Sequence, residues 1–166
     1  MPAFNVLLLS TTIVLTGTYV VTPQLYRPAP STIYRLTMTH AFLLMGAIFG
    51  MLAVAFGAFG AHALKSRLTV ELLNSYQTAV QYQFWHALAL LAVGLLVLQL
   101  NPSRLLQSSG WLFFLGTLLF SGSIYLLTLT NIRHIGVLNI GMLTPIGGLS
   151  LMLGWLLLIL ALWRNQ

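Results

Sequence analysis

The chain has 166 residues, of which 58% are hydrophobic and 5% are charged, and its formal net charge is +6. Soluble domains carry about 25% charged residues, so a surface this poor in charge excludes an ordinary soluble enzyme and a disordered tail. The 7 cations are scattered rather than clustered, which argues against a nucleic-acid partner. The chain has no cysteine for a disulfide or a thiolate metal site. The composition therefore predicts that the first partner of this chain is the lipid bilayer.

Residues 1–37 form an N-terminal extension, and residues 4–21 within it are uncharged but rich in serine and threonine. The extension lacks the basic start and the small-residue cleavage site of a signal peptide. We therefore expect an uncleaved transmembrane span over residues 4–21. A start of translation at Met38 is the alternative.

Residues 38–166 hold further long uncharged stretches and form the predicted membrane domain. A bilayer core of about 30 Å needs about 20 helical residues, and backbone groups in lipid must bond within their own segment. We therefore predict an all-α fold, a polytopic transmembrane helical bundle with four core spans. These spans cover about residues 41–61, 80–100, 111–129 and 145–163.

The last uncharged stretch, residues 135–163, is too long for one upright span. Thr144 suits a helix N-cap, and Pro145 suits the first helical position because its missing N–H would be unpaired there anyway. We therefore predict a helix that begins at Pro145 and a loop before it. A longer helix that runs through Pro145 is the alternative.

The most polar connection is His62–Tyr82, where leucine, tyrosine and valine recur every four residues from Leu64 to Val80. This spacing predicts a short interfacial helix that runs into the span at 80–100. Thr69 suits its N-cap, and Glu71 then lies in the first turn, where a negative charge is favoured. A connecting helix with no further role is the alternative.

The loop cations divide unevenly between the two sides of the predicted bundle. One side carries Arg27, Arg35, Arg104 and Arg164, and the other carries Lys65, Arg67 and Arg133. Because cytoplasmic loops hold an excess of lysine and arginine, the first side and the C-terminus are predicted to be cytoplasmic.

Polar side chains recur inside the predicted spans and, at Thr144, directly before the last span, and we name them the polar seam. In lipid such groups turn inward and bond across helices, so a structural role is one interpretation and a ligand or transport path is the other. The seam comprises Tyr82, Gln83, His86, Ser121, Ser123, Tyr125 and Thr144.

Three of the four histidines, His62, His86 and His134, are predicted to share one face of the membrane with Glu71, and these four residues are the candidates for a metal site. No H-x-x-x-H or H-E-x-x-H spacing supports such a site. We therefore predict no metal and no cofactor, with the histidines bonding helix ends and loop carbonyls.

Catalytic patterns are missing from the sequence. There is no G-x-S-x-G motif, no Walker loop and no G-x-G-x-x-G. Only Glu71 could supply the acid of a triad, and this shortage of carboxylates also argues against a paired-carboxylate mechanism. We therefore predict that the protein is not an enzyme.

Small residues mark two of the spans as packing surfaces. They permit close approach of helix backbones, so the spans at 41–61 and 145–163 are expected to cross tightly, within one chain or between copies. The glycines concerned are Gly46, Gly50, Gly57, Gly60, Gly147, Gly148 and Gly154.

The assembled residues form ordered motifs. These are GAFGAH (57–62), YQFWH (82–86), FSGSIY (120–125), and TPIGG (144–148) followed by GW (154–155). Between about Met38 and Arg164 the chain resembles the family of small multi-pass membrane proteins labelled domain of unknown function 423, the YgdD-like and transmembrane protein 256-like proteins. The resemblance implies a four-helix protein of the bacterial inner membrane, and it brings no reaction, ligand or cofactor. His62 and His86 fall inside the motifs, whereas His134 does not.

Three functions remain open from the sequence. The first is a non-enzymatic accessory or interaction subunit of a membrane complex, or a homo-oligomer. The second is a small transporter or channel that uses the polar seam. The third is a metal- or haem-contacting subunit that uses His62 and His86.

Overall fold

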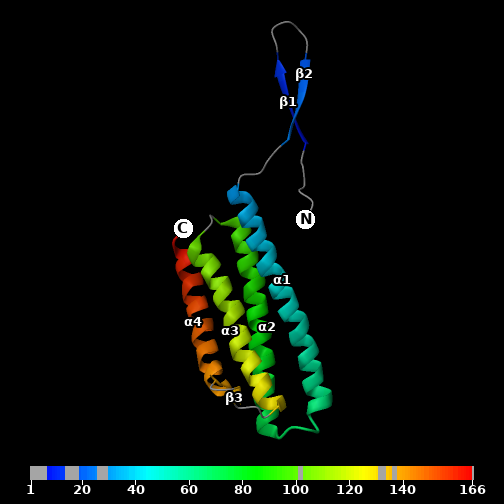
Figure 1. The fold of residues 1–166 in the computed structure, drawn as a ribbon, viewed down its shortest axis with the longest axis vertical. Coiled ribbons are helices and arrows are strands. Elements are labelled where there is room, and N and C mark those ends of the chain that lie inside the picture. Colours follow the sequence, from blue (N-terminus) through cyan, green and yellow to red (C-terminus); the bar gives the residue numbers. More distant parts are fainter. Residues whose placement is uncertain are drawn as a thin grey trace. The chain divides into compact units, whose positions relative to one another are not determined.

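The computed structural model describes residues 7–13, 19–25, 30–100, 103–130, 134–135 and 138–165. The chain forms two compact units, Met1–Tyr34 and Arg35–Gln166. Within the first unit, strands β1 (Leu7–Ile13) and β2 (Tyr19–Leu25) pair antiparallel (Figure 1).

This hairpin differs from the span that we expected over residues 4–21. The described parts of that range are strands, so they do not form the predicted helix. The physical reason lies in the side chains, because β1 and β2 are rich in threonine, valine and isoleucine, whose branched Cβ atoms favour extended backbone. Hydropathy alone does not register that preference.

The second unit is built on four long helices, which confirms the predicted all-α membrane bundle. Each helix is long and apolar enough to cross a membrane. A short π-helix, η1 (Gly60–Leu64), follows the first of them, and a two-residue strand pair, β3 (His134–Ile135) with β4 (Leu138–Asn139), precedes the last. The helices are α1 (Pro30–Phe59), α2 (Val70–Gln99), α3 (Arg104–Thr130) and α4 (Ile140–Trp163).

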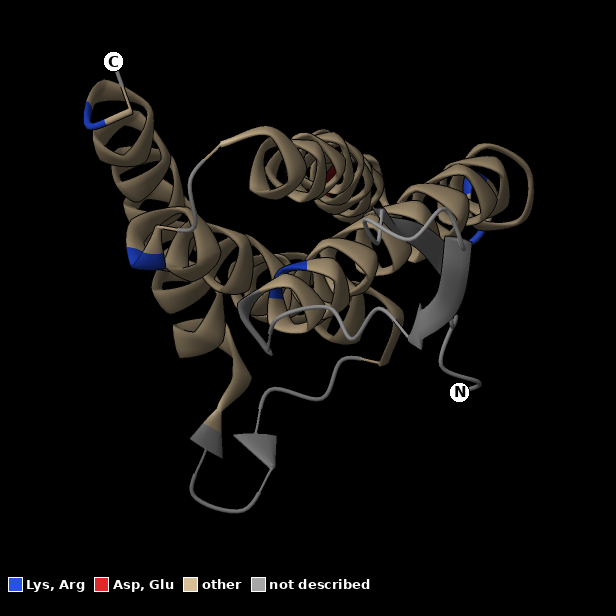
Figure 2. Ribbon diagram, turned by 90° about the horizontal axis from the view of Figure 1, so that it is seen from above, with Lys and Arg blue, Asp and Glu red and all other residues tan. Residues whose placement is uncertain are grey.

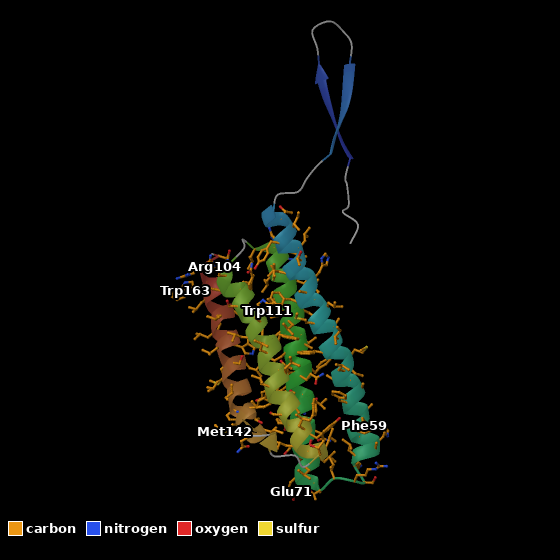
Figure 3. The ribbon with its side chains drawn as sticks, viewed as in Figure 1. Phe59, Glu71, Arg104, Trp111, Met142 and Trp163 are labelled. Atoms are coloured by element: carbon orange, nitrogen blue, oxygen red, sulfur yellow. The ribbon has the colours of Figure 1, made fainter. Side chains whose placement is uncertain are left out.

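Successive helices run in opposite directions, with α2 and α3 lying between α1 and α4 (Figure 1). In the ribbon coloured by residue type, lysine, arginine and acidic residues occupy only short stretches (Figure 2). Arg104 and Trp163 lie at one end of the bundle, and Glu71 and Met142 lie at the other (Figure 3). The first end holds the C-terminus of α4, as the predicted topology requires.

α1 is longer than the predicted span over 41–61. Arg35 lies inside the helix, and its Nε donates to the carbonyl of Val97 at 2.7 Å while its Nη2 donates to the carbonyl of Leu98. These carbonyls belong to the last turns of α2, where helix carbonyls begin to lack helical donors and a cation is favoured. The predicted span began after His40, whereas α1 also includes the residues before it, and the partners of Arg35 on α2 let the helix hold this charge.

α2 joins two elements that the sequence predicted separately. The expected interfacial helix and the span over 80–100 are one continuous helix from Val70 to Gln99. Its N-cap is Thr69, as predicted, and Thr69 Oγ1 accepts a hydrogen bond from the Leu72 N–H at 3.4 Å.

The predicted helix start at Pro145 is wrong, and the alternative of a longer helix is confirmed. α4 begins at Ile140, with Asn139 as N-cap accepting from the Gly141 N–H at 3.0 Å. Pro145 is the sixth residue of α4 and has no N–H, so the helix loses the one backbone bond that this N–H would make to the Gly141 carbonyl and keeps the others. Thr144 is thereby freed from capping and contacts α3 instead.

Candidate functional site

The polar seam lies between the helices, and its centre is Gln83. This side chain is 5% exposed; its Nε2 donates to the Phe49 carbonyl at 2.9 Å, and its Oε1 accepts from the Tyr125 hydroxyl at 3.0 Å. One amide therefore joins α1, α2 and α3. Both ends of the Gln83 amide are used for helix contacts.

The seam hydroxyls bond to carbonyls and to each other. Ser121 Oγ donates to the Ala79 carbonyl at 2.8 Å, which fastens α3 to α2. Ser123 Oγ lies 2.7 Å from Thr144 Oγ1 and 2.9 Å from the Phe120 carbonyl, which fastens α3 to α4. The seam residues therefore lie between helices, but they form separate contacts at several helix interfaces rather than one cluster.

His86 is bonded at both ring nitrogens. Its Nδ1 lies 2.8 Å from the Tyr82 carbonyl, and its Nε2 accepts from Trp155 Nε1 at 3.2 Å. An indole N–H can only donate, so Nε2 is the acceptor and Nδ1 carries the proton. In this arrangement neither ring nitrogen is left to bind a metal ion or a haem iron.

One of the three histidines, His86, does not lie at the end of the bundle that holds Glu71. His86 lies near the middle of α2, about 22 Å along the helix from Glu71 at about 1.5 Å per residue. His62 is exposed in η1, and the side chain of His134 lies outside the described residues. Within the described part of the chain, no three metal-ligating side chains come together. The prediction was wrong for His86 because it began the span at about residue 80, too close to this histidine.

Tyr82 takes part in the seam through its ring. It stacks on Phe120 with ring centroids 4.6 Å apart, and Trp85 lies 5.3 Å away at a tilt. Stacked aromatic pairs add to the packing of helices beyond their area alone. Tyr82 therefore contributes to the contact between α2 and α3.

The predicted packing glycines lie at helix interfaces inside one chain. A Cβ on Gly46 would meet the Ala87 carbonyl oxygen at 2.9 Å, and one on Gly154 would meet the Phe113 ring at 2.8 Å. On Gly147 it would overlap the backbone of Phe120. Near a Cβ placed on Gly50, Gly57, Gly60 and Gly148, the nearest atoms belong to Ala87, Val80, Tyr76 and Phe120.

These contacts correct one expectation. We expected the spans at 41–61 and 145–163 to cross, within one chain or between copies; within one chain the α1 glycines instead face α2 and the α4 glycines face α3. Close helix approach needs a small residue on one side only, so a large partner such as Leu91 or Phe113 fills the space. The sequence pattern identified the small surfaces without identifying their partners.

Hydrogen bonds between helices are also made by Tyr76, Ser150 and Trp155, which the sequence did not place in the polar seam. Tyr76 donates its hydroxyl to the Phe56 carbonyl at 2.9 Å, just before the π-helix, and Ser150 Oγ donates to the Leu112 carbonyl at 3.0 Å. Trp155, whose indole bonds His86, stood in a family motif, which was the available signal. Like the seam residues, these side chains hold neighbouring helices together by hydrogen bonds.

A small pocket remains beside Gln83, between α1 and α3. Its volume is about 130 Å³. The polar side chains at its wall are Gln83, Thr117, Ser121 and Tyr125, and each donates or accepts a hydrogen bond within the bundle. The pocket is therefore bordered by polar groups that already have partners.

Comparison with known proteins places the chain among membrane proteins. Residues 56–148 match the family model described as protein of unknown function (DUF423). The UPF0382 membrane protein SSP2132 of Staphylococcus saprophyticus is 42% identical over 123 residues, which cover 74% of this chain and 97% of that protein. The UPF0382 membrane protein YwdK of Bacillus subtilis is 39% identical over 120 residues, 72% of this chain and 94% of that protein. No solved structure matches the chain.

Proposed function

The chain belongs to the DUF423 family of membrane proteins, and from this premise we propose that it is a non-enzymatic subunit of a membrane assembly. Its partners are other membrane-spanning chains, either further copies of itself or different proteins. The function is to contact those partners within the bilayer rather than to transform a substrate.

One observation carries this proposal: the central polar groups of the bundle bond to neighbouring helices, although the buried Thr39 hydroxyl of α1 has no partner among the described residues. Gln83, Ser121 and His86 all bond to partners on neighbouring helices. A catalytic group needs a free donor, acceptor or nucleophile facing its substrate. Groups that already serve the fold favour a structural or interaction protein over an enzyme.

A transporter or channel is less well supported. Such a protein needs polar groups that line a path and can exchange partners with the substrate. The two seam serines instead donate to helix carbonyls, and Ser123 also pairs with Thr144. A metal- or haem-contacting subunit is disfavoured by the bonds at both nitrogens of His86.

We further propose that the protein lies in the bacterial inner membrane with its C-terminus in the cytoplasm. Among the described residues, the C-terminal end of the bundle holds Arg35, Arg104 and Arg164, while the other end holds Lys65 and Arg67. The larger count of basic residues favours the cytoplasmic side for the first end.

The chain suits a test of this orientation because it contains no cysteine. In spheroplasts, a membrane-impermeant maleimide should label Ser66→Cys at once. It should label Asn165→Cys only after the membrane is permeabilised. The reverse order of labelling would overturn the proposed orientation.

The mass of the protein as extracted from the membrane tests the proposed function. The protein is expressed at its natural level, extracted with its surrounding lipid in polymer discs, and weighed by native mass spectrometry. An assembly of defined stoichiometry, larger than the 18.3 kDa chain, is the expected result. A lone monomer under these conditions would overturn the proposal.

A further inference from the structure

Gln81 is a polar residue of α2 that points away from the bundle. Its side chain is exposed, and within the described part of the chain its amide has no hydrogen-bond partner. Gln83, only two residues later, is buried and bonded at both ends of its amide. The same side chain therefore occurs twice on this helix in opposite situations.

The depth of Gln81 follows from its neighbours. Ala79 and Gln83, which flank it, bond to Ser121 and Tyr125 of α3. Ser121 lies about 6 Å along the axis from Thr117, the middle residue of α3, at about 1.5 Å per residue. Half of a bilayer core is about 15 Å, so Gln81 lies at the level of the lipid tails. Lipid tails offer it neither a donor nor an acceptor.

A groove between α1 and α2 surrounds this amide. It consists of two adjoining hollows of about 310 and 180 Å³ that share Val80 and Gln81. Small residues of α1, Ala53 and Gly57, leave the space open. The remaining wall residues are Val54, Tyr76, Gln77, Phe84 and Trp85.

We propose that this groove is an interface with a second copy of the same chain, in which the two Gln81 amides bond to each other. This inference rests on the proposed function and names the partner and the surface. A primary amide carries both a donor and an acceptor. Two copies related by a two-fold axis place Gln81 opposite itself, so each amide donates to the other and neither faces lipid.

The shape of the surface supports a self-complementary contact. Trp85 and Val54 protrude, being 52% and 65% exposed, while Ala53 and Gly57 leave hollows beside them. In a two-fold interface each copy supplies both features to the other. Gln77 lies one turn from Gln81 on the same side of α2 and extends the polar contact.

Cysteine cross-linking tests the interface directly. In membranes under oxidising conditions, Gln77→Cys should yield a covalent dimer. Leu149→Cys, which is 61% exposed on α4, should not. Adding Gln81→Leu to Gln77→Cys should reduce the dimer at least fivefold, whereas Gln81→Asn, which keeps an amide, should retain most of it.

A matched control distinguishes the loss of the Gln81 amide from the general effect of replacing a glutamine of α2 with leucine. Gln99→Leu makes the same change on an exposed position at the far end of α2 and should leave the dimer unchanged. Circular dichroism of each variant verifies that the helices remain formed. Cross-linking that is equal at Gln77→Cys and Leu149→Cys, or that is insensitive to Gln81→Leu, would overturn the interface.

Mass spectrometry distinguishes this inference from the proposed function. If wild-type protein is a monomer without partners, both fail. If it forms an assembly whose mass Gln81→Leu leaves unchanged, only this interface fails. Loss of a bound lipid or of a different protein in Gln81→Leu, with no loss of a second copy, would also overturn it.

Discussion

The two faces of α2 carry similar side chains in opposite circumstances. On the inner face, Gln83 and His86 are 5% exposed, and both bond to neighbouring helices. On the outer face, Gln77 and Gln81 are exposed beside an apolar groove. Lipid offers neither a donor nor an acceptor, so the inward amide bonds to neighbouring helices, whereas the outward amide of Gln81 has no bond within the described part of the chain.

Glycine provides a second contrast of this kind. A Cβ on Gly147 of α4 would overlap the backbone of Phe120, whereas a Cβ on Gly122 of α3 would meet nothing within 4 Å. One glycine is required by a helix contact, and the other borders open space beside the pocket at Gln83. Each contrast can be tested with a single change made at both positions.

The largest expected effect is that of Gly147→Ala. Because the obstructing atoms belong to the backbone of Phe120 rather than to a movable side-chain end, α3 and α4 must separate. We expect the free energy of unfolding to fall by about 3 kcal/mol, the upper part of the usual range for overpacking. Titration with sodium dodecyl sulfate, followed by circular dichroism, measures it.

Gly122→Ala is the control for that change. It removes glycine from a helix interior without a clash, so stability should rise by about 0.5–1 kcal/mol. Equal losses in the two variants would mean that the contact between Gly147 and Phe120 is not the source of the effect.

The next largest effect is the difference in stability between Gln83→Leu and Gln81→Leu. Gln83→Leu leaves the Tyr125 hydroxyl without its acceptor and should lower the free energy of unfolding by about 2 kcal/mol. Gln81→Leu removes an unbonded amide from a lipid-facing position and should not destabilise the single chain. The same titration, made with protein diluted to monomers, measures both. A greater loss of stability for Gln81→Leu than for Gln83→Leu would contradict the assignment of Gln83 to the inner face and Gln81 to the outer face.

Hydropathy and spacing predicted the four core helices because lipid demands long apolar segments with internal backbone bonds. They also predicted that Gln83 turns inward, whereas Thr144 was predicted as an N-cap and instead contacts Ser123 of α3. The helix ends were missed for a definite reason: charges and prolines stop a hydropathy pattern, whereas Arg35 finds carbonyls on α2 and Asn139 caps α4 ahead of Pro145.

The hydrogen-bond partners on neighbouring helices were harder to predict than the helices themselves. His86 was assigned to a membrane face because the start of α2 was unknown, and its bond to Trp155 depends on how α4 packs. Gln81 stood inside the predicted span over 80–100, so the signal of an intramembrane amide was present. Only the packing of α1 and α2 decides that it points outward.

A smaller effect concerns the bond between Trp155 and His86. Trp155→Phe keeps an aromatic ring but removes the only indole donor to His86 Nε2, so stability should fall by about 1 kcal/mol. Nitrogen-15 shifts of His86 should report a proton on Nδ1 in the wild type. Trp163→Phe, at an exposed position, should change neither quantity. An Nε2-protonated His86 in the wild type would contradict the assigned bond.

The smallest effect is the coupling between Ser123 and Thr144 across α3 and α4. Hydroxyl pairs between membrane helices contribute about 0.6 kcal/mol on average, because the separated helices also find partners. A cycle of Ser123→Ala, Thr144→Val and the double variant isolates that term from each residue's own effect. Ser123 also donates to the Phe120 carbonyl, so Ser123→Ala alone should lose more than the coupling. A coupling near zero would mean that the Phe120 carbonyl, rather than Thr144, is the partner that holds Ser123 inside the bundle.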